Sequence, residues 1–347
     1  MRRWLRIKEL GLVGILMALT ATSWMALPSF RSGIMASQIL ENSTLIILLA
    51  LGEAVVMVTR QIDLSVGAIM GLTAYVVGSW IGHLGGGQAN PVLAVLLSMA
   101  MGSVMGLGNA VLVDRARMPA IIATLATLSI YSGLQVVVTG GSQLYAYQLP
   151  GWLANLLSVS WLGIPSFIWI AAILVLSLSV AMRSTRWGRD LYAMGSSPEH
   201  AAYAGVRTRL RTFQAFGLCG AVSGLAGLLY AAQYGNVDAT AGAGMELTAI
   251  AAAVIGGVSL FGGSGSAVGA ALGAVLLLEI ETILAILKIS IFAQQTLQGV
   301  AIIASVTLYA VLGRVGRSSR RGGRGDSATL EPRGRAALGA VETGEKA

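Results

Sequence analysis

Apolar residues dominate this chain in ten long runs, which are separated by short polar or glycine-rich breaks. A bilayer core about 30 Å thick is crossed by about 20 apolar residues of helix. The runs approach that length, although the second and the eighth are short, so the pattern predicts an all-α integral membrane protein with about ten transmembrane helices. The predicted spans are Leu10–Leu27, Thr44–Thr59, Leu64–Gly82, Pro91–Val113, Met118–Thr139, Trp161–Met182, Thr212–Ala232, Leu247–Phe261, Ala267–Leu287 and Phe292–Leu312.

Lysine and arginine are unevenly divided between the two sets of loops that these spans create. Cytoplasmic loops of membrane proteins hold the excess of positive charge. With the N-terminus inside and the spans alternating in direction, 21 of the 23 basic residues fall inside, and only Arg31 and Lys288 fall outside. We therefore expect both termini to be cytoplasmic. Residues 1–9 would precede a membrane domain over residues 10–312, and residues 313–347 would form a disordered basic tail.

The first span has two interpretations. Its basic residues, its apolar run and the small residues Ala18, Ala21 and Ala26 also fit a cleavable signal peptide. The charge distribution does not separate the two, because removing this span leaves the other nine oriented as before. The apolar run, at 18 residues, is long for a signal core, so we favour a retained anchoring helix.

Composition excludes several classes of protein. Only 11% of the residues are charged, against roughly 25% in soluble domains, so a soluble enzyme, a disordered chain and a nucleic-acid-binding protein are ruled out despite the net charge of +8. A single cysteine, Cys219, and two histidines exclude a disulfide framework and a Cys- or His-rich metal site. None of the three lysines precedes Ser or Thr. A Walker A loop is therefore impossible, and any ATP must be hydrolysed by another chain.

Acidic side chains fall within or at the edges of several spans, where a charge near the bilayer centre costs about 2.5–3.5 kcal/mol. Asp63 and Glu246 each lie near a predicted helix N-terminus, where the backbone N–H groups favour an anion. Glu53 lies inside the second span, either as a protonated or hydrogen-bonded contact between helices or as a polar group of the translocation path. We take Glu53, Asp63, Asn109 and Gln135 as the candidate residues of that path.

Glycine pairs four residues apart recur inside the spans. Gly67 with Gly71 and Gly269 with Gly273 are examples, and such pairs let membrane helices approach closely, although a pore lining is the alternative. The pattern Val-Gly-Ala-x-x-Gly that begins at Val66 returns 202 residues later, and each copy opens a span that runs from inside to outside. This faint repeat suggests two similar halves in parallel orientation, as some transporters have.

The loop between the sixth and seventh spans, residues 184–208, is the most informative cytoplasmic segment. Ser196 or Ser197 can cap a short helix, Pro198–Ala204, that has Pro198 in its first turn. Ser196 and Glu199 have the spacing of a capping box, and Gly205 supplies a left-handed stop. An isolated helix of this length is unstable in water. It must pack either on its own bundle or in the groove of a cytoplasmic partner, and the residues leave both alternatives open.

Three segments between about Glu41 and Gly313 carry motifs in a fixed order, and Met118-Pro119-Ala120 adds a weaker one. The three are Ile62-Asp63-Leu64-Ser65-Val66-Gly67, Thr185-x-x-Gly188-Arg189-x-x-Tyr192-Ala193-x-Gly195-x-x-Pro198-Glu199-x-Ala201-x-x-x-Gly205, and Glu246-x-x-Ala249-Ile250-Ala251-Ala252-x-Val254-Ile255-Gly256-Gly257-x-Ser259-Leu260-x-Gly262-Gly263-x-Gly265-Ser266. Together they resemble the membrane permease subunit of the ABC importers for ribose, rhamnose, related monosaccharides and the autoinducer-2 signal.

The resemblance implies a multi-pass permease of the bacterial cytoplasmic (inner) membrane that is not an enzyme and holds no cofactor. A cytoplasmic ABC ATPase would bind the ATP, an extracytoplasmic binding protein would deliver the sugar, and a second copy or a sister permease would complete the pore. The short helix would be the coupling helix that contacts the ATPase. The residues implied in coupling are Gly188, Arg189, Gly195, Pro198, Glu199, Ala201 and Gly205.

The chain departs from the family pattern at two places in this loop. Ser197 and His200 stand where the family often has Asn before the proline and Ala after the glutamate, and both remain compatible with a capped helix. The alternative hypotheses are an ion-coupled secondary transporter of a small polar solute and a non-transporting scaffold or sensor. No span interior carries an obvious basic partner for a buried acid, which disfavours proton coupling. For a sugar importer we expect a deoxy-sugar, a pentose or an autoinducer-2-type ligand.

Overall fold

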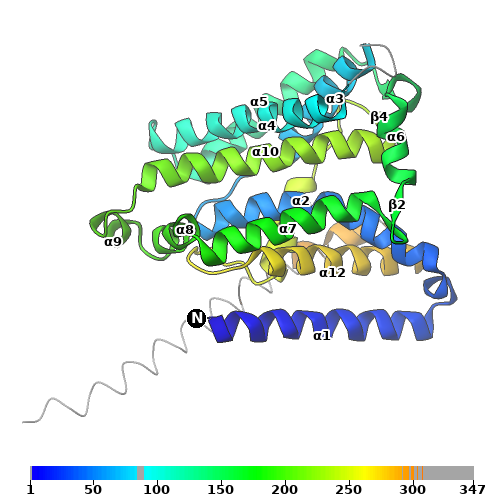
Figure 1. The fold of residues 1–347 in the computed structure, drawn as a ribbon, viewed down its shortest axis with the longest axis horizontal. Helices are drawn as coiled ribbons and strands as arrows, with labels where there is room; N and C mark the ends of the chain where they lie inside the picture. The colour runs from blue at the N-terminus through cyan, green and yellow to red at the C-terminus, as the bar shows by residue number, and fades with distance from the viewer. Residues whose placement is uncertain are drawn as a thin grey trace, which may run out of the picture. The chain divides into compact units, whose positions relative to one another are not determined.

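A computed structural model divides the chain into two units, Met1–Val306 and Thr307–Ala347. The structure describes residues 2–83, 90–290, 292–296 and 298–300, together with positions 303 and 307. The first unit is built almost entirely from helices (Figure 1). This confirms the all-α class that the apolar runs predict.

Eight helices of the described residues are long and apolar enough to cross a membrane. Each coincides with one of the predicted spans, which confirms a multi-pass membrane protein. The second is much longer than predicted, because the polar residues between Gly33 and Thr44 continue the helix instead of ending it. The eight are α1 (Arg2–Ala26), α2 (Gly33–Val58), α3 (Val66–His83), α4 (Pro91–Asp114), α5 (Ala120–Thr139), α7 (Ser166–Ser184), α10 (Thr208–Tyr234) and α12 (Ala267–Ile286).

Two predicted spans have a different outcome. The eighth, Leu247–Phe261, is wrong as a full span: α11 (Met245–Ile255) has 11 residues, or about 16 Å at 1.5 Å per residue, roughly half of a hydrocarbon core. The chain leaves the helix at Gly256, and Gly257 has a φ of +84°. The tenth, Phe292–Leu312, lies mostly outside the described residues, as does the predicted basic tail.

Short elements join the long helices at one end of the bundle. Strands β1 and β4 pair antiparallel, with Leu144 opposite Val237, and β2 and β3 form a hairpin that precedes α7. This hairpin contains Trp161, so the sixth span begins later than predicted, at Ser166. The short elements are η1 (Pro28–Arg31), β1 (Leu144–Tyr145), η2 (Ala146–Gln148), α6 (Gly151–Ser158), β2 (Ser160–Trp161), β3 (Ile164–Pro165) and β4 (Asn236–Val237).

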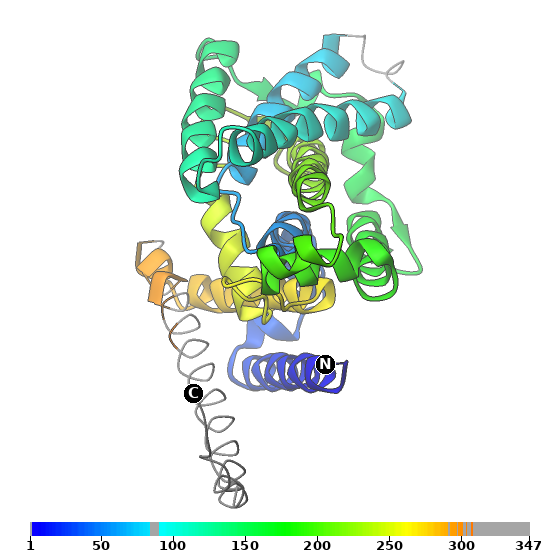
Figure 2. The same cartoon turned by 90° about the vertical axis from the view of Figure 1, so that its left-hand side faces the viewer.

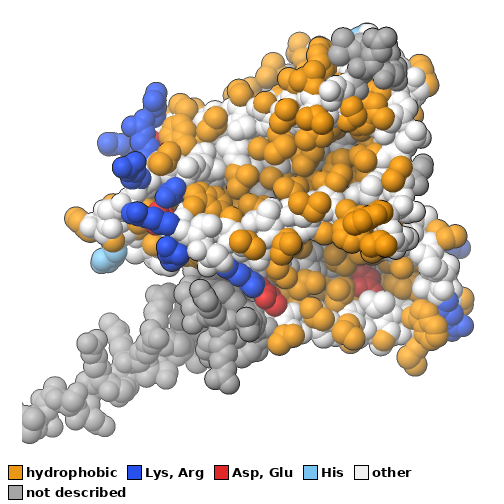
Figure 3. Space-filling model, in the orientation of Figure 1, with side chains coloured by type: hydrophobic (Ala, Val, Ile, Leu, Met, Phe, Trp, Pro, Cys, Tyr) orange, Lys and Arg blue, Asp and Glu red, His pale blue; other side chains and the backbone are white. Residues whose placement is uncertain are grey.

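The opposite end of the bundle carries α8 (Arg186–Ser196) and α9 (Pro198–Tyr203), between α7 and α10 (Figure 1). On the face drawn in Figure 3, most Lys and Arg side chains gather at this end. We call it the basic end. Its charge agrees with the predicted cytoplasmic location of residues 184–208, because positive charge is retained on that side of a membrane.

Helices α2 and α10 form the centre of the bundle and are almost completely buried (Figure 2). Helix α10 packs on α4 through glycines of both helices: a Cβ on Gly220 would lie 2.1 Å from the carbonyl oxygen of Gly102. A Cβ on Gly224 would lie 2.0 Å from the oxygen of Ser98. These contacts support close packing as the role of the glycine pairs in α4 and α10.

The two copies of the Val-Gly-Ala-x-x-Gly pattern open α3 and α12, and both put their glycines against backbone. In α3, a Cβ on Gly67 would lie 2.4 Å from the oxygen of Gly242, a residue of the segment before α11. In α12, a Cβ on Gly269 would lie 2.2 Å from the oxygen of Gly256, at the end of α11. The repeated pattern therefore serves the same packing need with different partners, and the predicted parallel halves stay a prediction.

Candidate functional site

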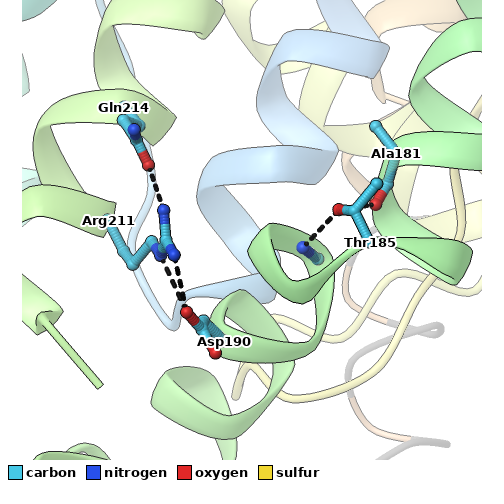
Figure 4. Close-up of polar contacts among 6 residues, drawn as sticks. Ala181, Thr185, Asp190, Arg211 and Gln214 are labelled. Atoms are coloured by element: carbon cyan, nitrogen blue, oxygen red, sulfur yellow. Dashed lines mark hydrogen bonds and ion pairs between the residues drawn. The ribbon is translucent and has the colours of Figure 1, made fainter. Parts of the chain in front are cut away.

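The α7–α8 turn at the basic end is fixed by Thr185 and Gly188. The Thr185 side chain caps α8, where its Oγ1 accepts a hydrogen bond from the Gly188 N–H at 3.2 Å and donates one to the Ala181 oxygen at 2.6 Å (Figure 4). A Cβ on Gly188 would lie 2.1 Å from the Met182 oxygen. Only glycine allows α8 to fold back this tightly on α7. This explains why a glycine stands at position 188, one of the residues assigned to coupling.

An ion pair ties α8 to α10. Arg211 donates from Nη2 and Nε to Asp190 Oδ2, at 2.7 and 3.1 Å, and from Nη1 to Gln214 Oε1 at 2.7 Å (Figure 4). Both charged side chains are largely covered, with 16% and 14% of their surface exposed. This pair was not predicted from the sequence, where its signal is two opposite charges 21 residues apart, on the helices before and after α9.

Helix α8 also packs against the end of α2 and against the loop before α12. A Cβ on Gly195 would lie 1.8 Å from the Val58 oxygen, and that oxygen also accepts a hydrogen bond from the Gly263 N–H at 2.9 Å. Tyr192 donates from its hydroxyl to the Gly265 oxygen at 2.8 Å. Burial raises the pKa of Tyr192 to about 12, so the phenol keeps its proton at physiological pH and remains a donor.

The start of α9 differs from the predicted capping box. Ser196 is the last residue of α8, and its hydroxyl donates to the Tyr192 oxygen at 2.9 Å, so it does not cap α9. Ser197 occupies the N-cap position without a side-chain cap, and its Oγ lies 2.6 Å from His200 Nδ1. The box is wrong because α8 continues to Ser196. Pro198 is the first residue of the helix, as predicted.

The end of α9 confirms the predicted left-handed stop. Gly205 has a φ of +80°. The Val206 N–H donates to the Ala201 oxygen and the Gly205 N–H to the Ala202 oxygen, both at 3.0 Å. This pair of bonds is a Schellman motif, which ends a helix with glycine in the left-handed conformation.

The two faces of α9 have different environments. Ala201 is buried against the bundle at 4% exposure, while Tyr203 is 91% exposed. Glu199 and His200 are exposed too, and so is Arg189 on α8, whose Nη1 lies 3.4 Å from the Ser184 oxygen. The helix therefore packs on its own bundle and still presents a free face, so the two alternatives for this segment are compatible.

A second cluster of polar side chains lies inside the bundle, in the break between α2 and α3. Asp63 is completely buried, and its Oδ1 accepts from the Ser65 N–H at 2.9 Å and from the Ser65 hydroxyl at 2.6 Å. Asp63 thus closes a short turn at Ser65 just before α3, close to the helix N-terminus where an acid is expected. Asn109 donates from Nδ2 to both Asp63 oxygens at 3.1 Å, and Glu53 Oε1 accepts from the Asp63 N–H at 3.2 Å.

The four candidate residues of the translocation path do not form one site. Glu53, Asp63 and Asn109 come together and are completely buried. Gln135 lies elsewhere, on α5, where its Nε2 donates to the oxygens of Asp238 and Ala241 at 3.0 and 3.1 Å. Among the described residues, Glu53 Oε2 and Asn109 Oδ1 have no hydrogen-bond partner. Assignment of these four residues to a path stays a prediction.

Glu246 lies in the first turn of α11, as expected for an acid at a helix N-terminus. Its Oε2 is covered and has no hydrogen-bond partner in the described part of the chain. The carboxylate sits against α3: a Cβ on Gly67 would lie 2.5 Å from this oxygen. Glu246 also lines a cavity together with Gln135.

The bundle and its basic end define a class: a multi-pass membrane protein with a short helix pair, α8 and α9, between two spans. A model of the family described as "Branched-chain amino acid transport system / permease component" matches residues 35–306. The chain belongs to this family of ABC importer permeases. No solved structure matches it.

Several relatives are named as permeases of one import system. The chain is 38% identical over 267 residues to the autoinducer 2 import system permease protein LsrC of Salmonella typhimurium, covering 77% of this chain and 75% of the relative. It is 38% identical over 268 residues to that of Escherichia coli, covering 77% of each chain. The protein of Yersinia pseudotuberculosis is 39% identical over 267 residues, covering 77% of this chain and 74% of the relative. These relatives are transport permeases and not enzymes, and the chain is a multi-pass protein of the inner membrane.

Proposed function

We propose that this chain carries autoinducer 2, or a small polyhydroxylated ligand chemically close to it, through the membrane in a complex with a separate cytoplasmic ATPase. A binding protein on the outer side would deliver the ligand. Two facts support the proposal. The relatives with 38–39% identity are named for autoinducer 2 import, and the sequence has no lysine in the context that a nucleotide-binding loop requires.

The free face of α9 is the observation that carries the assignment of an ATPase partner. A six-residue helix is too short to be stable alone, and here it is held by Ala201 while Tyr203 projects outward. Exposed aromatic side chains beside polar ones are typical of a docking surface. The ATPase would bind α9 on this face.

Motion at α9 would reach the spans through α8. The contacts of Gly195 with Val58 join α8 to α2, and the pair of Asp190 and Arg211 joins it to α10. Helices α2 and α10 are the buried centre of the bundle. Closure of the ATPase pair on ATP would therefore shift the central helices together with α8 and α9, and alternate the opening of the path between the two sides of the membrane.

The test is binding and uptake with a change on the exposed face of α9. Tyr203→Ala removes a side chain with few contacts to its own chain, so we expect normal membrane insertion, at least tenfold weaker capture of the partner ATPase, and a matching loss of ATP-driven uptake. Tyr147→Ala is the matched control for ATPase capture, because Tyr147 is 82% exposed at the opposite end. Equal ATPase capture by the two variants would remove α9 as the docking site.

A further inference from the structure

Helix α1 is the least covered of the eight long helices. It lies at the edge of the bundle and packs beside α12 (Figures 1 and 2, dark blue). Only 6% of its apolar stretch is buried. Apolar contacts of this extent do little to fix the rotation and depth of a membrane helix, because lipid tails are as apolar as the neighbouring helix. The position of α1 against the bundle therefore depends on its polar contacts.

Glu9, where the apolar stretch of α1 begins, makes such contacts at the basic end. Its Oε1 accepts a hydrogen bond from Ser266 Oγ at 2.6 Å and forms an ion pair with Arg183 Nη2. The Glu9 side chain is 16% exposed. Its two partners belong to α7 and to the residue just before α12. One carboxylate of α1 thus connects two other helices.

Both partners suit an acid at this position. Arg183 lies in the last turn of α7, where a cation is favourable. Ser266 is the N-cap of α12, and its Oγ accepts from the Gly269 N–H at 3.0 Å. A carboxylate beside a helix N-terminus is favoured by the helix dipole. A neutral side chain at position 9 would leave the guanidinium without this counter-charge.

The two partners of Glu9 are also both connected to α8. Arg183 lies in the turn of α7 that leads into α8. Ser266 follows Gly265, whose oxygen accepts from the Tyr192 hydroxyl of α8 at 2.8 Å. Glu9 and Arg183 lie close enough to this phenol to act on its pKa in opposite directions. Glu9 therefore closes a ring that consists of the end of α7, α8, the loop before α12 and the start of α1.

We propose that Glu9 is a positioning residue for the coupling of ATP hydrolysis to transport, an inference that rests on the proposed function. By closing this ring, its carboxylate holds the start of α12 to the α7–α8 turn, so a shift of α8 carries α12 with it. The ion pair of α8 with α10 and its close packing on α2 pass the same shift to the centre of the bundle. Without the Glu9 charge, α12 follows α8 less closely, and less ligand crosses for each ATP hydrolysed.

Uptake per hydrolysed ATP tests this role in the full chain, reconstituted with its ATPase and binding protein. Glu9→Gln keeps the size of the side chain and can still accept from Ser266, but it no longer pairs with Arg183 as an anion. We expect ATP hydrolysis within about twofold of the parent and uptake per ATP roughly threefold lower, an effect in the range of a partly exposed ion pair.

Asp114→Asn is the matched control. Asp114 is 20% exposed and pairs with Arg209 at 2.9 Å at the same end of the bundle, but this pair joins α4 to α10 outside the ring. Its uptake per ATP should equal that of the parent. The proposal is overturned if Glu9→Gln has the ratio of the parent, or if the control loses as much as Glu9→Gln.

Charge exchange separates positioning from a merely structural role. Glu9→Arg places two guanidinium groups together, so both the Tm of the permease in detergent and the uptake per ATP should fall. Adding Arg183→Glu restores opposite charges and should recover a large part of both. A Tm that falls and recovers, with uptake per ATP unchanged throughout, would assign Glu9 a structural role only. Recovery of neither quantity would mean that the pair does not form, and would overturn the ring.

The role of Glu9 also requires that α1 is retained. The intact mass of the purified chain should include residues 1–26. A mature chain that begins after Ala26 would lack Glu9 and would overturn the proposal.

Failure of this inference differs from failure of the proposed function. If the parent imports autoinducer 2 with ATP and Glu9→Gln keeps the same uptake per ATP, the positioning role is wrong and the function stands. If the parent imports none of autoinducer 2, ribose or rhamnose, while the Tm of Glu9→Arg falls and recovers on charge exchange, the ring stands and the proposed function is wrong.

Discussion

Two non-helical stretches enter the membrane bundle, and they differ in how far their own chain covers them. In the stretch before α3, Asp63 and Ser65 have no exposed surface, and the Ile62 oxygen accepts a hydrogen bond from Thr124 Oγ1 at 3.3 Å. In the stretch before α11, Gln135 donates hydrogen bonds to two carbonyl oxygens, yet Thr240 and Ala243 remain exposed. In the first stretch Asp63 and Ser65 are covered by their own chain while Gln61, Ile62 and Leu64 keep partial exposure, whereas in the second Thr240, Ala243 and Gly244 are exposed.

This difference lies in how far each break is covered by its own chain. Both stretches must satisfy their backbone without lipid. The break at Asp63 does so with protein groups, which fixes the start of α3 and leaves no room for a passing ligand. The break at residues 238–244 also satisfies backbone groups with protein, as where the Ala243 N–H donates to the Thr240 oxygen at 3.1 Å, but it leaves Thr240 and Ala243 exposed on the surface of this chain. The four changes below test this distinction and its link to the basic end, beginning with the largest expected effect.

Asp63→Leu should have the largest effect, because it removes the acceptor for Ser65 and Asn109 and leaves both buried without it. Each unsatisfied buried group costs about 1–3 kcal/mol, so folded protein should be largely lost from the membrane, as measured by size-exclusion yield and Tm in detergent. Asp63→Asn is the control. Asn109 Oδ1, which has no hydrogen-bond partner among the described residues, can accept from the new amide once the Asn109 amide flips. A Leu variant with the Tm of the parent would contradict the burial of these groups.

Gly71→Ala should affect transport more than folding. Its new Cβ would lie 1.9 Å from the Ala241 oxygen, so the segment at residues 238–244 must shift, at a cost of about 1–3 kcal/mol for an overpacked contact. We expect uptake to fall at least tenfold with a modest loss in Tm. Gly11→Ala provides the comparison, since a Cβ at Gly11 meets nothing within 4 Å. Full uptake by Gly71→Ala would show that the position of this segment is irrelevant to the path.

Arg211→Met should uncouple the basic end from the spans. It leaves the largely covered Asp190 carboxylate without its partner on α10, and removing one member of such a pair costs roughly 1–3 kcal/mol. ATP hydrolysis by the complex should continue while uptake per ATP falls severalfold. The double exchange Asp190→Arg with Arg211→Asp should restore part of the uptake. If it does not, and Arg211→Met transports normally, the ion pair plays no part in coupling.

Gly205→Val should have the smallest effect of the four. A β-branched residue at a φ of +80° costs about 1–2 kcal/mol, and the space around it is open. The end of α9 should loosen, and ATPase capture should weaken a few-fold in a pull-down. Gly205→Asn should be closer to the parent, because asparagine tolerates this conformation. Identical capture by all three proteins would separate the helix stop from docking.

The parts of the fold that sequence predicted are those set by local chemistry. Long apolar runs predicted the eight full spans, and Gly205 predicted the end of α9. The predicted full span Leu247–Phe261 was wrong because a short helix and the glycine-rich turn after it are both apolar, so composition does not show where the helix ends. The predicted capping box at Ser196 was wrong because α8 extends far enough to include this serine as its last residue.

The parts that sequence did not predict depend on distant contacts. Gln135 was a candidate for its polar side chain, but its partners, the oxygens of Asp238 and Ala241, lie more than 100 residues away. The exposure of residues 238–244 depends on how α3 and α5 pack beside them. Conversely, Asp63 was predicted near a helix N-terminus from its place in the polar break before the third span, and its partner Ser65 is only two residues away.

Transport by purified protein in liposomes tests the central claim most directly. The account predicts that this chain, reconstituted with its ATPase and the ligand-loaded binding protein, accumulates autoinducer 2 only with ATP, and that vanadate stops the uptake. An ion gradient alone should drive none. Accumulation of the ligand by the chain alone on a sodium or proton gradient would contradict the account and establish an ion-coupled secondary transporter.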